Sequence, residues 1–165
     1  MMNDSAFSIE RFLRLTGDRL ARYAAVCTER FAREGPEAFC RQLHACLSDM
    51  DSEHTVYAVE MGMHLMPSLF LDNTIRLLQH SNSDVCCAAF RAIDTLPTRL
   101  ITNAAIDQIK VTPVVDLFAT SFATGRPARS GTNEVFLRKI YEKLGIREPE
   151  HKHARYEPKK DRHNP

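Results

Sequence analysis

Apolar residues recur at helical spacing from the first part of the chain onward. Ser8 is a suitable N-cap for this pattern, and Gly35 ends it just before Pro36. The segment between them predicts one long helix, or two helices that meet near Gly17. Its apolar face is made by Ile9, Phe12, Leu13, Leu20, Ala24, Cys27 and Phe31.

After Pro36 the helical pattern comes in pairs of segments joined by short polar turns. Proline fits the first turn of a helix but interrupts its interior. The prolines that separate the pairs lie about 30 residues apart, at Pro36, Pro67, Pro97 and Pro127. We therefore predict a helical-hairpin repeat of this length. The paired helices are expected at residues 36–48 with 52–66, 69–80 with 85–96, and 100–109 with 113–124.

The second of these pairs carries the clearest repeat pattern. Residues 77–93 read LLQHSNSDVCCAAFRAI, in which a leucine-rich helix is followed by a turn with Asp84, then Val85 and small residues. This pattern resembles a HEAT-like repeat of the short type, with Cys86 where such repeats usually have a basic residue. The resemblance implies an all-α fold: an α–α superhelix of stacked helical hairpins, HEAT/armadillo-like, with capping helices at both ends.

The C-terminal part of the chain changes character. Residues 125–131 contain Gly, Pro and Ser and predict a loop. Residues 132–144 predict a last amphipathic helix that ends at Gly145 and caps the stack. Residues 146–165 are mostly charged and predict a disordered tail. The expected organisation is one helical-repeat domain over residues 1–145, followed by that tail.

Composition indicates where such a protein would work. Of the 165 residues, 44% are hydrophobic and 26% are charged, which is ordinary for a globular domain. No apolar stretch approaches the roughly 20 residues that span a bilayer, and Asn3 and Asp4 stand where a secretory signal has basic residues. The five cysteines lie within helical patterns. We expect a cytoplasmic protein with reduced thiols and no membrane association.

The sequence contains no nucleophile elbow, phosphate-binding loop, HExxH or CxxC motif. Glu60 and His64 lie four residues apart on one predicted helix and could contact one metal, but such pairs often arise by chance. The adjacent Cys86 and Cys87 project about 100° apart around a helix, which favours small core residues over a redox pair. We expect no enzyme activity, no catalytic residue, no metal and no cofactor.

The polar faces of the second helices are the best candidate for a binding surface, because in stacked hairpins these helices usually line the concave side. Residues 36–67 hold one basic and five acidic side chains, so this surface is acidic. We expect a protein-interaction module, an adaptor, scaffold or inhibitor, that binds a basic segment of another protein. Because every amphipathic helix has a polar face, plain solvation remains the alternative. The candidate residues are Glu53, Tyr57, Glu60, His64, Asp84, Arg91, Asp94 and Asp116.

The basic C-terminal end raises a second hypothesis. Residues 125–165 hold eleven basic side chains, which could bind phosphates, interleaved with six acidic ones. The alternative function is therefore a helical-repeat protein that binds nucleic acid through its last helix and tail. The candidate residues for this function are Arg126, Arg129, Arg138, Lys139 and Lys143.

Overall fold

The computed structural model describes residues 7–120 and 126–147, and this part of the chain is mostly helical. No helix in it is both long and apolar enough to cross a membrane. In chain order its elements are α1 (Ile9–Arg14), α2 (Gly17–Glu34), α3 (Glu37–Cys46), the 3-10 turn η2 (Leu47–Asp49), α4 (Ser52–Leu65), α5 (Pro67–Leu77), α6 (Ser83–Thr95), the 3-10 turn η3 (Thr98–Leu100), α7 (Asn103–Lys110), β1 (Asp116–Thr120), β2 (Pro127–Thr132) and α8 (Glu134–Leu144).

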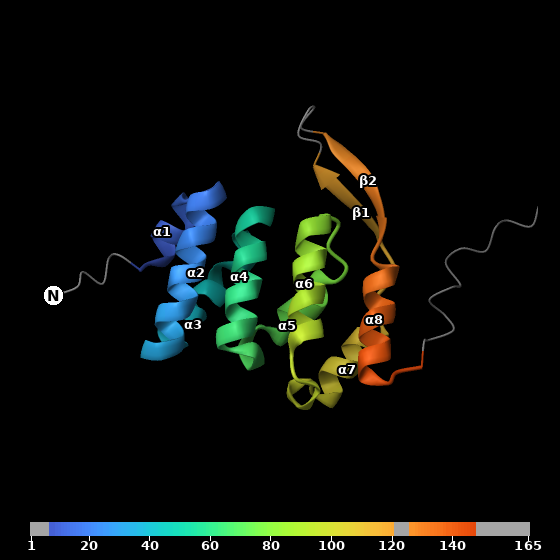
Figure 1. Ribbon diagram of the computed structural model, residues 1–165. Helices are drawn as coiled ribbons and strands as arrows, with labels where there is room; N and C mark the ends of the chain where they lie inside the picture. The colour runs from blue at the N-terminus through green and yellow to red at the C-terminus, as the bar shows by residue number, and fades with distance from the viewer. Residues whose placement is uncertain (1–6, 121–125, 148–165) are drawn as a thin grey trace, which may run out of the picture.

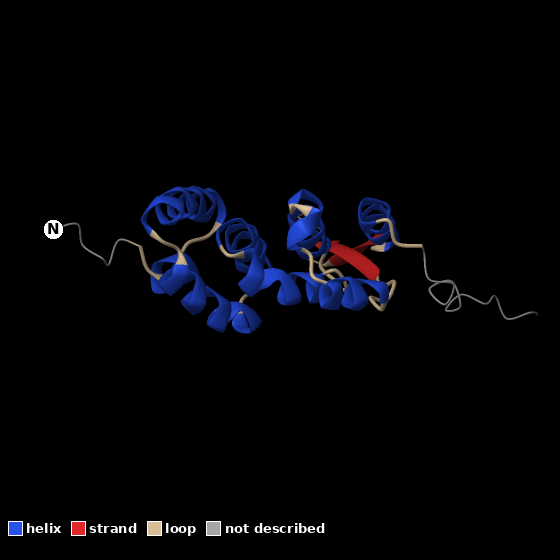
Figure 2. Cartoon of the chain, turned by 90° about the horizontal axis from the view of Figure 1, so that it is seen from below, coloured by secondary structure: helices blue, strands red, loops and turns tan. Residues whose placement is uncertain are grey.

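The helices lie in two layers (Figures 1 and 2). Helices α2, α4, α6 and α8 stand side by side in one layer, and α3, α5 and α7 form the other. Helix α4 packs against α2 and α6 in its own layer and against α3 and α5 in the opposite one. From α2 to α8 the helices therefore alternate between the layers, as successive helical hairpins do.

Local sequence signals set the helix boundaries. Helices α1, α4, α6 and α7 each begin after a side chain that accepts a hydrogen bond from a backbone N–H of the first turn, and this removes an unsatisfied donor. Pro67 occupies the first turn of α5, where its missing N–H costs nothing. The capping residues are Ser8 for α1, Asp51 for α4, Asn82 for α6 and Thr102 for α7.

The apolar core lies between the two layers, and successive turns of α4 contribute buried residues to it. Ala58, Val59, Met61 and Met63 of this helix are all buried. Gly62 faces α5, where a Cβ would lie 2.4 Å from the ring of the fully buried Phe70. Only a glycine therefore lets α5 approach α4 so closely.

Most of the predicted helices are confirmed, with ends shifted by a few residues. The N-terminal segment is broken before Gly17 into α1 and α2, which is the two-helix alternative. The four helices predicted within residues 36–96 correspond to α3, α4, α5 and α6, and the last helix is α8. All five cysteines are free, as expected for reduced thiols. Cys86, at the position usually basic in the repeat, is buried and its thiol donates to the Leu78 carbonyl.

The C-terminal boundary of the helical part falls slightly later than expected. Ile146, assigned to the tail, packs against the core, and its N–H donates to the Tyr141 carbonyl beyond the left-handed Gly145. Residues 148–165 of the predicted tail lie outside the described part of the chain. The division into one domain and a tail therefore stays a prediction.

The prediction of a helix at residues 113–124 is wrong over its described part, residues 113–120, and residues 121–124 lie outside the described part of the chain. Residues 116–120 form β1, which pairs antiparallel with β2, and β2 replaces much of the predicted loop at 125–131. The register shifts between Leu117 and Phe118, where Gly131 has a φ of 112° that suits glycine. This hairpin projects beyond the helical layers (Figure 1), and α8 takes the place beside α6 that the predicted helix would have held.

Asn133 joins three separate segments of the chain from a fully buried position just before α8. Its side-chain Nδ2 donates to the Leu78 carbonyl at 2.7 Å and to the Pro113 carbonyl at 3.1 Å. Its Oδ1 accepts from the Val115 N–H at 2.9 Å, and its own N–H donates to the Val115 carbonyl. This one amide therefore ties the end of α5 and the entry to the hairpin to the start of α8.

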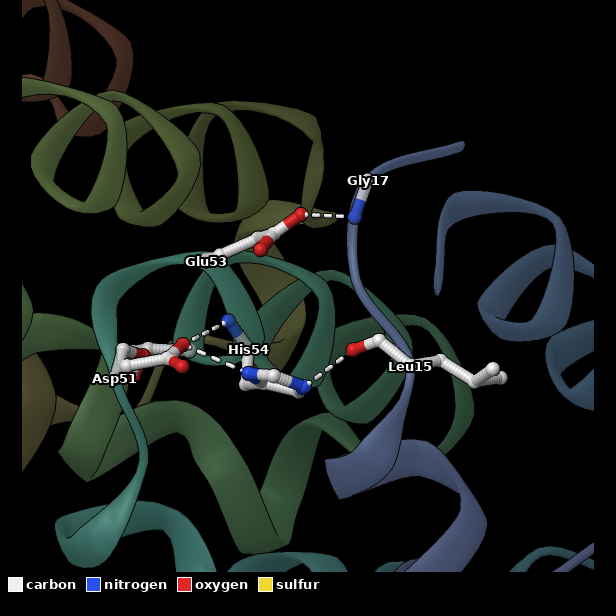
Figure 3. Close-up of polar contacts among 6 residues, drawn as sticks. Leu15, Gly17, Asp51, Glu53 and His54 are labelled. Carbon is white, nitrogen blue, oxygen red and sulfur yellow. Dashed lines mark hydrogen bonds and ion pairs between the residues drawn. The ribbon is translucent and has the colours of Figure 1, made fainter. Parts of the chain in front are cut away.

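A second buried polar side chain, His54, joins the N-terminal helices to α4 (Figure 3). Its Nδ1 lies 2.7 Å from Asp51 Oδ1 and its Nε2 lies 2.9 Å from the Leu15 carbonyl oxygen, so both ring nitrogens face acceptors. Partial burial raises the pKa of Asp51, but the hydrogen bonds from the His54 N–H and imidazole outweigh it, and the net pKa is lowered. The imidazolium form satisfies both acceptors.

Replacing Asn133 tests the first of these polar connections. The Asn133→Ala variant removes the side-chain partner of the Pro113 carbonyl and of the Val115 N–H, and it leaves the Leu78 carbonyl with only the Cys86 thiol. We therefore expect the free energy of unfolding to fall by about 2–3 kcal/mol. Urea denaturation monitored by circular dichroism measures it. The matched control is Asn103→Ala at an exposed position of α7, which should stay within about 0.5 kcal/mol of the wild type. Equal losses in the two variants would contradict the role of Asn133.

Replacing Asp51 tests the charge opposite His54. The Asp51→Asn variant keeps an N-cap acceptor but loses the carboxylate. Because the folded-state pKa of Asp51 is lowered, its contribution is fully present above its unfolded pKa and disappears as the pH falls through the folded value. We expect a loss below about 1 kcal/mol at pH 6, since Asp51 is 64% exposed, and a smaller loss at pH 3. Urea denaturation at both pH values measures it, with Asp49→Asn at an exposed position as the matched control.

Candidate functional site

The exposed side of α4 lies between two grooves on the layer formed by α2, α4 and α6. The groove between α2 and α4, here the α2–α4 groove, has a volume of about 740 Å³. The groove between α4 and α6, the α4–α6 groove, has two adjoining hollows of about 610 and 440 Å³. Glu60 lines all three hollows. Tyr57 and His64 each line the α2–α4 groove and one of the two hollows of the α4–α6 groove.

The helical spacing of α4 explains why these residues share one surface. Tyr57, Glu60 and His64 fall at positions i, i+3 and i+7 of the helix, which repeat on one face. The apolar residues between them are buried on the opposite side of the same helix. Across the α4–α6 groove, Asp84 and Arg91 come from α6 at the same helical spacing of seven residues. Six of the eight predicted partner-binding residues therefore line these two grooves: Glu53, Tyr57, Glu60, His64, Asp84 and Arg91.

Glu60 is the most perturbed carboxylate on this surface. Desolvation in the grooves raises its pKa above the ordinary value, and the Arg91 guanidinium across the α4–α6 groove offsets only part of this effect. Among the described residues no basic nitrogen lies within ion-pair distance of this carboxylate. The negative charge of ionised Glu60 is therefore only partly compensated by nearby positive charge.

Glu53 lines the α4–α6 groove but is also engaged within the fold. Its Oε1 accepts a hydrogen bond of 2.6 Å from the Gly17 N–H (Figure 3). Gly17 is the first residue of α2, and Thr16 before it makes no side-chain capping bond. A carboxylate at this helix N-terminus satisfies a free donor and opposes the positive end of the helix dipole. Glu53 thus caps α2 from the neighbouring helix.

Asp94 and Asp116 lie apart from the grooves. Asp94 is exposed near the end of α6, and its carbonyl, not its carboxylate, makes the contact with Lys143. The expectation that Asp116 extends the row on a third second helix is wrong, because Asp116 begins strand β1. Its carboxylate accepts a hydrogen bond of 3.0 Å from Arg129 on β2.

The small residues of α2 form the other wall of the α2–α4 groove, and sequence reasoning missed them. Ala21, Ala25, Thr28 and Ala32 line this groove, and their short side chains leave its wall open. They recur at i, i+4, i+7 and i+11, which is the spacing of one helical face. The same periodicity that identified the polar row of α4 could therefore have found them.

The five basic residues proposed for nucleic-acid binding come from the hairpin and from α8, and several of them are engaged within the fold. Arg129 pairs with Asp116 on the hairpin, Arg138 pairs with Glu134 within α8, and Lys139 lies 5.9 Å from the centroid of the Phe90 ring. Arg126 precedes β2, at the hairpin.

Lys143, the fifth member of that set, holds the end of α6. Its ammonium donates to the Ile93 carbonyl at 2.9 Å, to the Leu96 carbonyl at 2.7 Å and to the Asp94 carbonyl. The last carbonyls of a helix have no partner within the helix, and a cation there also opposes the negative end of the dipole. Lys143 thus clamps α8 to the end of α6.

Comparisons of the chain with protein-family models, with curated proteins and with solved structures gave no match. The described residues also contain no group of three or more His, Cys, Asp or Glu side chains placed to hold a metal ion.

Replacing Lys143 tests the clamp between α8 and α6. The Lys143→Met variant keeps the aliphatic stem but removes the ammonium donor from three carbonyls, of which that of Ile93 keeps the Leu96 N–H. We therefore expect a loss of about 1–2 kcal/mol in the free energy of unfolding. Thermal and urea denaturation measure it. The control Lys110→Met, at an exposed position at the end of α7, should change little. A Lys143→Met protein as stable as the control would show that the clamp contributes nothing.

Proposed function

We propose that this protein is an interaction module of the stacked helical-hairpin, HEAT-like type, and that it binds a basic segment of another protein along the α2–α4 and α4–α6 grooves. The observation that carries the proposal is the carboxylate of Glu60 at the junction of the two grooves, whose charge Arg91 compensates only in part. A lysine or arginine from a partner would supply the missing counter-charge, and this contact would be stronger than one at a fully solvated acid.

The surroundings of Glu60 support a protein as the occupant. Tyr57 adds an aromatic ring beside it in the α2–α4 groove, and Tyr residues frequently anchor protein interfaces. Asp84 adds a second exposed carboxylate in the α4–α6 groove. The alternation of the helices between two layers supports the repeat architecture, in which one layer offers a continuous surface of parallel grooves.

Charge reversal on the groove layer tests this proposal. The double variant Glu60→Lys with Asp84→Lys places like charges against a basic partner, so we expect it to lose the proteins that the wild type captures from a lysate. Affinity capture followed by quantitative mass spectrometry measures the loss, which should reach about tenfold or more for each specific partner. Glu53 is left unchanged because it caps α2.

The matched control reverses two exposed acids on the opposite layer, with Glu37→Lys on α3 and Asp107→Lys on α7. This control has the same net charge as the groove variant, so general electrostatic effects are equal in both. We expect the control to capture the same proteins as the wild type. Capture that is unchanged in the groove variant, or reduced equally in both variants, would exclude the grooves as the binding surface.

A further inference from the structure

A separate hollow lies on the layer opposite the grooves, and none of the candidate sites above includes it. It is formed by the end of α3, the η2 turn, the first part of α4 and α5, and has a volume of about 420 Å³. This size is within the range of small-molecule sites. We name it the α3–α5 hollow; its lining residues are His44, Leu47, Ser48, Met50, Thr55, Asn73, Arg76, Leu77 and His80.

The α3–α5 hollow carries a positive charge, whereas residues 36–67, which supply part of its lining, are acidic overall. Its lining contains no aspartate or glutamate, although residues 36–67 hold five acidic side chains and one basic. The one permanently charged lining residue is Arg76, in the last turn of α5. Within the described part of the chain, the Arg76 guanidinium makes no hydrogen bond or ion pair. The hollow thus presents a cation without a counter-ion.

Each of the two histidines that line the hollow has one ring nitrogen in a hydrogen bond, and this bond sets the tautomer of the neutral ring. His80 Nδ1 accepts a hydrogen bond of 3.0 Å from the Asn82 N–H, so its Nε2 carries the proton of the neutral ring. His44 Nε2 lies 2.7 Å from the Asn73 amide nitrogen, which can only donate, so its Nδ1 carries the proton. Burial lowers the pKa of His80, which favours this neutral donor form.

An apolar part completes the hollow. Leu47 is buried, and Met50 and Leu77 are partly buried beside it. Such a surface favours an organic group over a bare inorganic ion, because it removes apolar area from water. The ligand that fits these features carries an oxyanion at one end and an apolar group at the other.

We propose that the α3–α5 hollow binds a small organic phosphomonoester, with the phosphate held by Arg76, His44 and His80 and the organic group against Leu47, Met50 and Leu77. A phosphomonoester has three terminal oxygens for the three donor side chains, whereas a carboxylate has two. Arginine suits this role because its planar guanidinium donates two parallel hydrogen bonds to phosphate. The site lies on the other layer from the grooves and shares no lining residue with them.

The test uses the full chain and phenyl phosphate as the probe, with NMR detection of the imidazole signals of His44 and His80. We expect saturable shifts of both signals, and tighter binding of phenyl phosphate than of inorganic phosphate, benzoate or phenol. The Arg76→Gln variant should weaken phenyl phosphate binding about tenfold or more, in line with the loss of a charged hydrogen-bonding partner.

The matched control is Arg22→Gln on α2, which removes an equally exposed arginine from the other layer and should leave the affinity unchanged. Because Arg76 is exposed and its guanidinium makes no hydrogen bond or ion pair within the described fold, its replacement should not unfold the protein, and the circular dichroism spectrum checks this. Absence of saturable histidine shifts would overturn the site. Equal weakening by the two arginine variants would do the same, and benzoate binding as tight as phenyl phosphate binding would overturn the assignment to phosphate.

Discussion

Phe70 of α5 lies against the bare backbone of Gly62 in α4, and this contact sets the distance between the two helical layers. Helix α4 has neighbours on four sides, so any change in that distance would be passed to α2, α3 and α6. A close-packed interior relaxes little around such a contact. The grooves on either side of α4 therefore depend on Gly62, a residue that lines neither of them.

Helical periodicity was sufficient to predict the part of the fold between residues 9 and 96, because each helix there has an apolar stripe and a clear start or stop signal. It failed at residues 113–124 for a physical reason. Val114, Leu117 and Phe118 fit the helical spacing i, i+3, i+4, but the same stretch is rich in β-branched and aromatic residues that also suit a strand. Gly131, which permits the bulge, was the local sign of a hairpin.

The candidate site could be predicted in part from the same periodicity. The residues on α4 and α6 come together because each set repeats along one helix, and this follows from sequence spacing. What spacing could not reveal is how individual side chains are used. Glu53 and Lys143 read as free surface charges, yet one caps α2 and the other holds the carbonyls of α6. Both contacts join helices distant in sequence, and only the packed structure places them together.

The clamp made by Lys143 has a consequence for how the chain is completed during synthesis. The carbonyls of α6 that it binds lie 47 to 50 residues earlier in the chain. At the usual rates of translation, on the order of 5–20 residues per second, α6 is made several seconds before its lysine. Helices α1 to α5 can pack together in that interval. The last turn of α6, in contrast, keeps exposed carbonyls until α8 has been made. The two ends of the molecule are thus finished at different times, the N-terminal end first.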